Sequence, residues 1–110
     1  MNLHDNAYEL AKAIRSCPEF QAMQAAKEKV EANEEAKKML VDFRTRQAEM
    51  QNQMMTGQMP PEDEMQDLQK MFEAVGANPV IAELFDAERR LSVLMEDVQK
   101  IIAAPFQDLA

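Results

Sequence analysis

The chain has 110 residues, a formal net charge of -8 and a single cysteine. A chain of this length is expected to form one domain over residues 1–110 and to bury only a modest core. The negative charge repels phosphate backbones and anionic lipid headgroups, so we predict no direct binding to nucleic acid or to a membrane. One cysteine excludes an internal disulfide, and the first residues lack the pattern of a signal peptide, which predicts a cytoplasmic protein.

Helix-forming residues dominate the composition, and only two glycines are present. The sequence therefore predicts an all-α fold of about five helices, arranged as a long-helix antiparallel bundle or hairpin and dimeric. The first two helices are predicted over residues 2–15 and 18–31, with Asn2 as the cap of the first. Ser16 is predicted to cap the second helix, and Glu19 completes a Ser-x-x-Glu capping box with it.

Residues 34–55 form the helix on which the rest of the prediction depends. Asn33 precedes this helix as its cap, and neither Gly nor Pro interrupts it. At about 1.5 Å per residue the helix is roughly 33 Å long, whereas a compact domain of this size has a radius of gyration near ~13 Å. We therefore expect a second copy or another protein to cover the part of its apolar seam that its own domain leaves exposed. The seam residues follow one another at three- and four-residue steps: Ala36, Leu40, Phe43, Gln47, Met50 and Met54.

The main reversal of the chain is predicted at Gly57 and the prolines that follow it. The next helix is predicted to begin at Pro61 and to end at Gly76. The last helix is predicted from Pro79 to about residue 103, with Pro105 ending it. This last helix has a broad apolar face, which indicates neighbours on two sides.

Gln47 and Glu88 are polar residues at predicted seam positions. Such a residue either fixes the register or the number of partners, or lies at the edge of the bundle with its polar head in water. Glu88 is expected to pair with Arg44, Arg46 or an arginine of a partner. The full set of residues predicted for the interface or packing seams is Leu40, Phe43, Gln47, Met50, Met54, Leu84, Glu88, Leu91, Met95 and Val98.

Cys17 and the methionines are the side chains that bear on a metal or redox site. Cys17 has no second cysteine, and His4 is the single histidine, so a zinc or cluster site is difficult to build within one chain. The methionines gather on both sides of Gly57, where they fill a core, form an adaptable partner surface or bind a soft metal. No phosphate-binding loop or catalytic motif is found, so we assign no catalytic, metal or cofactor residue and predict that the protein is not an enzyme.

Several short motifs follow one another along the chain, among them Ala7-x-x-Leu10, Glu19-Phe20, Phe43-Arg44-x-x-Gln47, Ala87-Glu88-x-Arg90-Leu91-Ser92-x-Leu94 and Lys100-Ile101-Ile102-x-x-Pro105. Their order and spacing resemble the YlbF/YmcA-like family of small bacterial helical proteins, and most closely its YheA-type branch. The resemblance implies an all-helical, dimeric protein of the bacterial cytoplasm. It also implies a regulatory role through assembly with other proteins, because relatives regulate competence, sporulation, biofilm formation and RNA processing in that way. Relatives that bind a cluster use several cysteines, whereas this chain offers Cys17 alone.

We therefore predict a non-enzymatic cytoplasmic protein that acts through self-association and protein–protein interaction. The predicted assembly is a homodimer, and the further protein partner is not identified by the sequence. The alternative interpretation is a metal- or iron–sulfur-binding regulatory protein that uses Cys17 or methionine side chains across a dimer.

Overall fold

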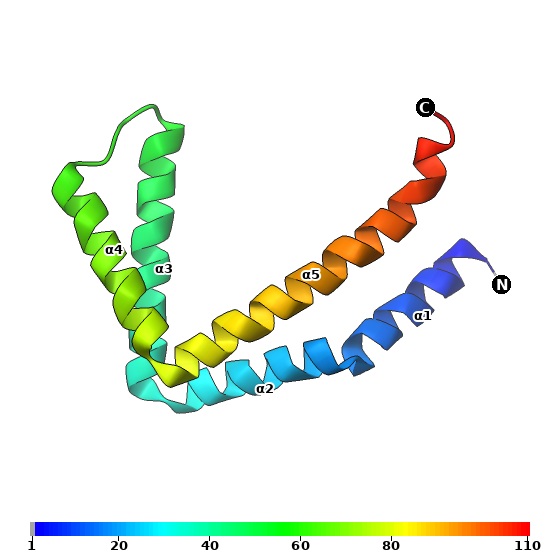
Figure 1. Ribbon diagram of the computed structural model, residues 1–110, viewed down its shortest axis with the longest axis horizontal. Coiled ribbons are helices and arrows are strands. Elements are labelled where there is room, and N and C mark those ends of the chain that lie inside the picture. Colours follow the sequence, from blue (N-terminus) through cyan, green and yellow to red (C-terminus); the bar gives the residue numbers. More distant parts are fainter. Residues whose placement is uncertain (1) are drawn as a thin grey trace.

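The computed structural model describes residues 2–110, and over this range the chain is all-α (Figure 1). Two antiparallel helix pairs, α3 with α4 and α2 with α5, diverge from a vertex where α2 meets α3 and α4 meets α5. No residue from 2 to 110 lies in a β-strand. The predicted all-α class and the helical hairpin are thus confirmed. The helices are α1 (Leu3–Ser16), α2 (Pro18–Ala32), α3 (Glu34–Met55), α4 (Glu62–Ala77) and α5 (Pro79–Gln107).

Helix α3 has the bounds that the sequence predicts. The Asn33 side chain accepts a hydrogen bond from the Ala36 backbone N–H at 3.0 Å, which satisfies a donor in the first turn. The helix continues unbroken to Met55, and the chain reverses at Gly57. The φ of Gly57 is 85°, a left-handed conformation that glycine adopts readily and that costs other residues free energy. The predicted long helix and the predicted place of the chain reversal are both confirmed.

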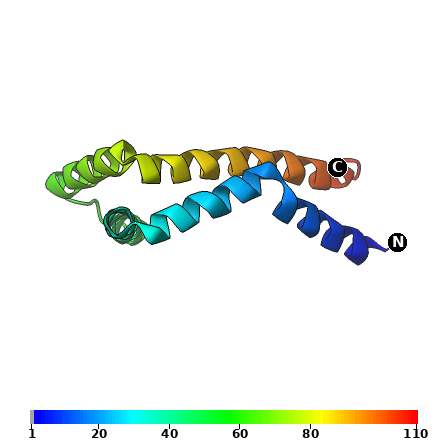
Figure 2. The same ribbon diagram turned by 90° about the horizontal axis from the view of Figure 1, so that it is seen from below.

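The chain bends sharply between α2 and α3, and this bend makes the fold V-shaped (Figure 1). Asn33 is in an extended conformation, with φ -114° and ψ 104°, so the two helices do not continue into one another. One arm, the hairpin arm, consists of α3 and α4, and the other, the long arm, consists of α1, α2 and α5. The Cα radius of gyration is 18.5 Å, against about 13 Å for a compact chain of this length. Seen from below, the V is thin, and α1 turns away from the distal half of α5 (Figure 2).

The hydrophobic core lies at the vertex, where four helices meet. Val75 of α4 and Ile81 and Leu84 of α5 are the largest side chains that are fully buried. They pack with Leu40 and Phe43 of α3, and the ring of Phe43 lies 5.8 Å from that of Phe72, centroid to centroid. No residue of α5 after Ala87 is buried, and none of α1 is buried. The core therefore holds the two arms together at one end and leaves the far ends of both arms open.

The capping box predicted at Ser16 and Glu19 is wrong. Ser16 is the last residue of α1, and its hydroxyl donates to the carbonyls of Lys12 and Ala13 at 3.2 and 3.1 Å. Cys17 takes the cap position of α2, without a side-chain hydrogen bond. The hydroxyl therefore bonds backward within α1, which continues one residue further than predicted, and does not cap α2.

Three predicted helix ends differ from the structure. Pro61 is the cap of α4 rather than its first residue, because its ψ of 149° is extended. Gly76 does not end α4, which continues to Ala77, and Gly76 does not have the positive φ of a glycine stop. Pro105 lies inside α5, which continues to Gln107. The carbonyl that loses its hydrogen bond to Pro105 lies in an exposed turn, where water can replace the missing N–H.

Candidate interaction surface

The predicted seam residues lie in different parts of the fold. Leu40, Phe43 and Leu84 are buried in the chain's own core, and Met50 is buried further along α3. Gln47 and Met54, on the same helix, are exposed. The remaining three apolar seam residues are half-buried on the distal half of α5: Leu91, Met95 and Val98.

Glu88 connects the two arms near the vertex. Its Oε1 accepts a hydrogen bond from the guanidinium of Arg44 on α3 at 2.8 Å, so of the partners considered for Glu88, the structure selects Arg44. A second ion pair across the α2–α3 bend joins Lys37 and Glu31 at 2.9 Å. These pairs edge a small cleft whose floor is apolar, formed by Val30, Leu40 and Leu84 among others. Lys27 also lines the cleft, so four of its five charged side chains are joined in these ion pairs.

An apolar groove runs along the hairpin arm between α3 and α4. No charged residue lines it, although 29% of the residues of the chain are charged. The aromatic ring of Phe72 is more than half exposed there, at 56%. Depletion of charge together with Met and Phe enrichment is typical of the centre of a protein–protein interface. The lining residues are Phe43, Gln47 and Met50 from α3 and Met65, Leu68, Gln69 and Phe72 from α4.

The α4 side of this groove was not among the residues predicted for the interface. The sequence places Met65, Leu68 and Phe72 on one face of a helix, and a single helical period does not distinguish a face buried in the chain's own core from one left open. The exposed apolar residues toward the end of α5 and beyond it were likewise outside the set predicted for the interface. Ile101, Ile102, Phe106 and Leu109 are exposed, and so is Leu3 at the start of α1.

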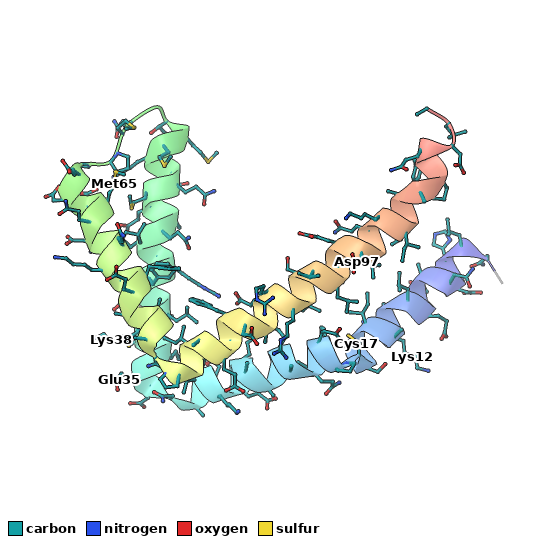
Figure 3. The ribbon with its side chains drawn as sticks, viewed as in Figure 1. Lys12, Cys17, Glu35, Lys38, Met65 and Asp97 are labelled. Atoms are coloured by element: carbon teal, nitrogen blue, oxygen red, sulfur yellow. The ribbon has the colours of Figure 1, made fainter. Side chains whose placement is uncertain are left out.

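Cys17 and the methionines near Gly57, the side chains considered for a soft-metal site, lie in different arms of the fold (Figure 3). Cys17 is a free, half-buried cysteine at the α1–α2 junction, on the arm opposite to Met65 at the hairpin tip (Figure 3). Met54, Met55 and Met59 are exposed near that tip, whereas Met50 is buried. Within residues 2–110, no group of three or more His, Cys, Asp or Glu side chains is placed to hold a metal ion.

Asp86 forms a local charge cluster on α5. It accepts a hydrogen bond from Arg89 at 2.7 Å and lies 3.1 Å from the Arg90 side chain. The hydrogen bond from Arg89, assisted by the positive charges of Arg90 and Arg89, lowers the pKa of the Asp86 carboxyl below its ordinary value. The cluster lies where α5 leaves the core, next to Ala87, the last buried residue of the helix.

Within residues 2–110, five helices in two open arms and an uncharged groove between two of them define a small all-α protein. None of the helices described for residues 2–110 has the length and apolar character needed to cross a bilayer. Residues 3–107 match the family described as "Control of competence regulator ComK, YlbF/YmcA", and the chain belongs to this family.

Similar sequences and structures agree with that assignment. A UPF0342 protein of Alkalihalophilus pseudofirmus is 44% identical over 108 residues, covering 98% of this chain and 92% of that protein. A UPF0342 protein of Streptococcus agalactiae is 40% identical over 108 residues, covering 98% and 97%. A protein of unknown function (DUF964) from Bacillus stearothermophilus superposes with a TM-score of 0.87 at 31% identity, covering 97% of this chain and 94% of that one. The yheA protein of Bacillus subtilis superposes with a TM-score of 0.73 at 30% identity over the full length of both chains. The predicted YheA-type membership is confirmed.

Proposed function

We propose that the protein is a non-enzymatic cytoplasmic regulator that works as a homodimer and acts by binding another protein. The observation that carries this proposal is the apolar surface left open along α5 beyond the vertex. Leu91, Met95 and Val98 are only half-buried, and Ile102 and Phe106 beyond them are exposed. Contiguous exposed apolar surface on a soluble chain marks an interaction site.

The accessible surface area gives this argument a magnitude. The chain exposes 8599 Å². A compact folded monomer of 12.5 kDa is expected to expose about 6,200 Å². The surplus of about 2,400 Å² per chain is comparable to what one subunit of an obligate homodimer buries, about 1,000 to 2,500 Å².

Helix stability supports the same conclusion. Helix α1 has 14 residues, and none of them is buried. Isolated helices shorter than about 12 to 15 residues are marginal in water, so α1 and the distal half of α5 need packing partners to be well populated. A second chain supplies such packing without a change in the fold of the first.

The regulatory part of the proposal rests on the family. Its description concerns the control of a competence regulator, and we extend to this chain only the general role of acting on another protein. The net charge of -8 keeps such a dimer soluble and favours partners that present positive charge to its outer surface.

The test is a matched pair of substitutions on α5, examined by light scattering at micromolar concentration. Val98 is half-buried in the predicted seam, whereas Val93 on the same helix is 50% exposed and lies on another face. We expect the wild type and Val93→Asp to be dimers and Val98→Asp to be largely monomeric, because the new carboxylate would be desolvated in the interface. A monomeric wild type would contradict the proposal, and so would a fully dimeric Val98→Asp.

A further inference from the structure

Beyond the vertex, α3 and α5 each have one face without charged residues, on the side where the two helices diverge. The ion pair between Arg44 and Glu88 identifies these sides, because it joins α3 to α5 at 2.8 Å. Residues three and four apart share a helix face, so the steps that follow Arg44 and Glu88 continue these faces outward. On α3 the stripe consists of Gln47, Ala48, Gln51 and Met55, and on α5 of Ser92, Met95, Gln99, Ile102 and Phe106. We call these the α3 stripe and the α5 stripe.

Both stripes are open to solvent and end in large apolar side chains. Met55 is 79% exposed at the end of the α3 stripe, and Ile102 and Phe106 are 53% and 70% exposed on the α5 stripe. No charged residue lies on either stripe beyond Arg44 and Glu88, in a chain where 29% of the residues are charged. The α3 stripe is also continuous with the apolar groove through Gln47.

The charge of the protein indicates which partner fits these stripes. Two copies of a chain with a net charge of -8 repel each other where acidic faces meet, so uncharged surface favours the close approach of a second copy. A basic partner would instead be attracted to the acidic outer faces. The side-chain amides of the α3 stripe also avoid the large desolvation cost of burying a charge.

We propose that two copies interlock, with the α5 stripe of each lying across the α3 stripe and apolar groove of the other. This inference rests on the proposed homodimer and adds its geometry. A two-fold axis repeats the contact, so each chain contributes both stripes to the interface. At about 1.5 Å per residue, the α5 stripe from Ser92 to Phe106 is roughly 21 Å long and spans the α3 stripe, which is roughly 12 Å long from Gln47 to Met55.

The experiment is cross-linking between single-cysteine variants in a Cys17→Ser background. Met55→Cys and Ile102→Cys are made separately, mixed, allowed to exchange subunits, and treated with a short bis-maleimide. We expect a covalent dimer containing one chain of each variant, in several-fold larger yield than from a mixture of Met55→Cys and Val93→Cys. The Val93 control is exposed on another face of α5.

The outcomes separate this inference from the proposed function. A dimeric mass for the wild type, combined with cross-linking only between identical positions or no excess over the Val93 control, overturns the interlocked arrangement and leaves the dimer intact. A monomeric wild type overturns both. Light scattering of each variant before cross-linking verifies that the substitutions leave the mass of the assembly the same as that of the wild type.

Discussion

Replacement by alanine is expected to change the stability of the protein in opposite directions at its two glycines. Gly57 has a φ of 85°, whereas Gly76 lies within α4, and at both positions an added Cβ has no heavy atom within 4 Å. The comparison is therefore free of steric clashes and reports on the backbone alone. Alanine at Gly57 has to adopt a left-handed conformation that costs roughly 1 to 2 kcal/mol, partly offset by about 0.5 kcal/mol from a less flexible unfolded chain. Alanine at Gly76 removes a glycine penalty of about 0.5 to 1 kcal/mol in the helix.

Urea unfolding followed by circular dichroism measures both effects. With a slope of about 1.5 kcal/mol/M, we expect Gly57→Ala to lower the midpoint by roughly 0.7 M and Gly76→Ala to raise it by roughly 0.5 M. Protein concentration has to be the same in all samples, because a dimer is stabilised by mass action. Gly57→Asn is the control, since asparagine tolerates the left-handed conformation better and should cost less than alanine. Midpoint shifts of the same sign for the two alanine variants would refute this account of the chain reversal and of α4.

Three further predictions concern the core, a helix cap and a surface charge cluster. Leu84→Ala should destabilise the protein by about 2 to 5 kcal/mol in urea unfolding, because Leu84 is only 2% exposed at the vertex. Leu109→Ala, at the exposed end of the chain, should change the stability by less than about 0.5 kcal/mol. Equal effects of these two variants would contradict the position of the core. Asn78→Ala should cost about 1 kcal/mol, because the Asn78 side chain accepts hydrogen bonds from the Val80 and Ile81 N–H groups at 3.0 and 3.4 Å, and Asn78→Asp should retain most of that stability. The lowered pKa of Asp86 means that its contribution to stability is present above the ordinary aspartate pKa and is lost as the pH falls through the lowered value. Carboxyl NMR should show the Asp86 titration moving to higher pH in Arg89→Ala, and an unchanged titration would rule out Arg89 as the cause.

Local signals in the sequence were sufficient to place the five helices, although not every helix end. The cap at Asn33, the absence of Gly and Pro over residues 34–55 and the turn at Gly57 define α3 without tertiary information, because each acts within a few residues. The wrong capping box shows the limit of such signals. Ser16 has two backbone acceptors in the preceding turn, and a hydroxyl that can bond to either helix is not assigned by spacing alone.

The candidate interaction surface was harder to predict from the sequence than the helices. Leu40 and Met95 have the same helical periodicity, yet Leu40 is buried at the vertex and Met95 lies on the open half of α5. The difference arises from the angle between α2 and α3 at Asn33, which a cap residue does not determine. The helical periodicity of apolar residues therefore indicates which helix face packs against another surface. The three-dimensional arrangement decides whether that surface belongs to the same chain.

Sedimentation equilibrium of the wild-type protein over a wide range of concentrations tests the central claim most directly. The proposed dimer predicts a single species of twice the 12.5 kDa chain mass at micromolar concentration, dissociating only on strong dilution. A mass of one chain throughout this range would contradict the claim that the open arms are covered by a second copy.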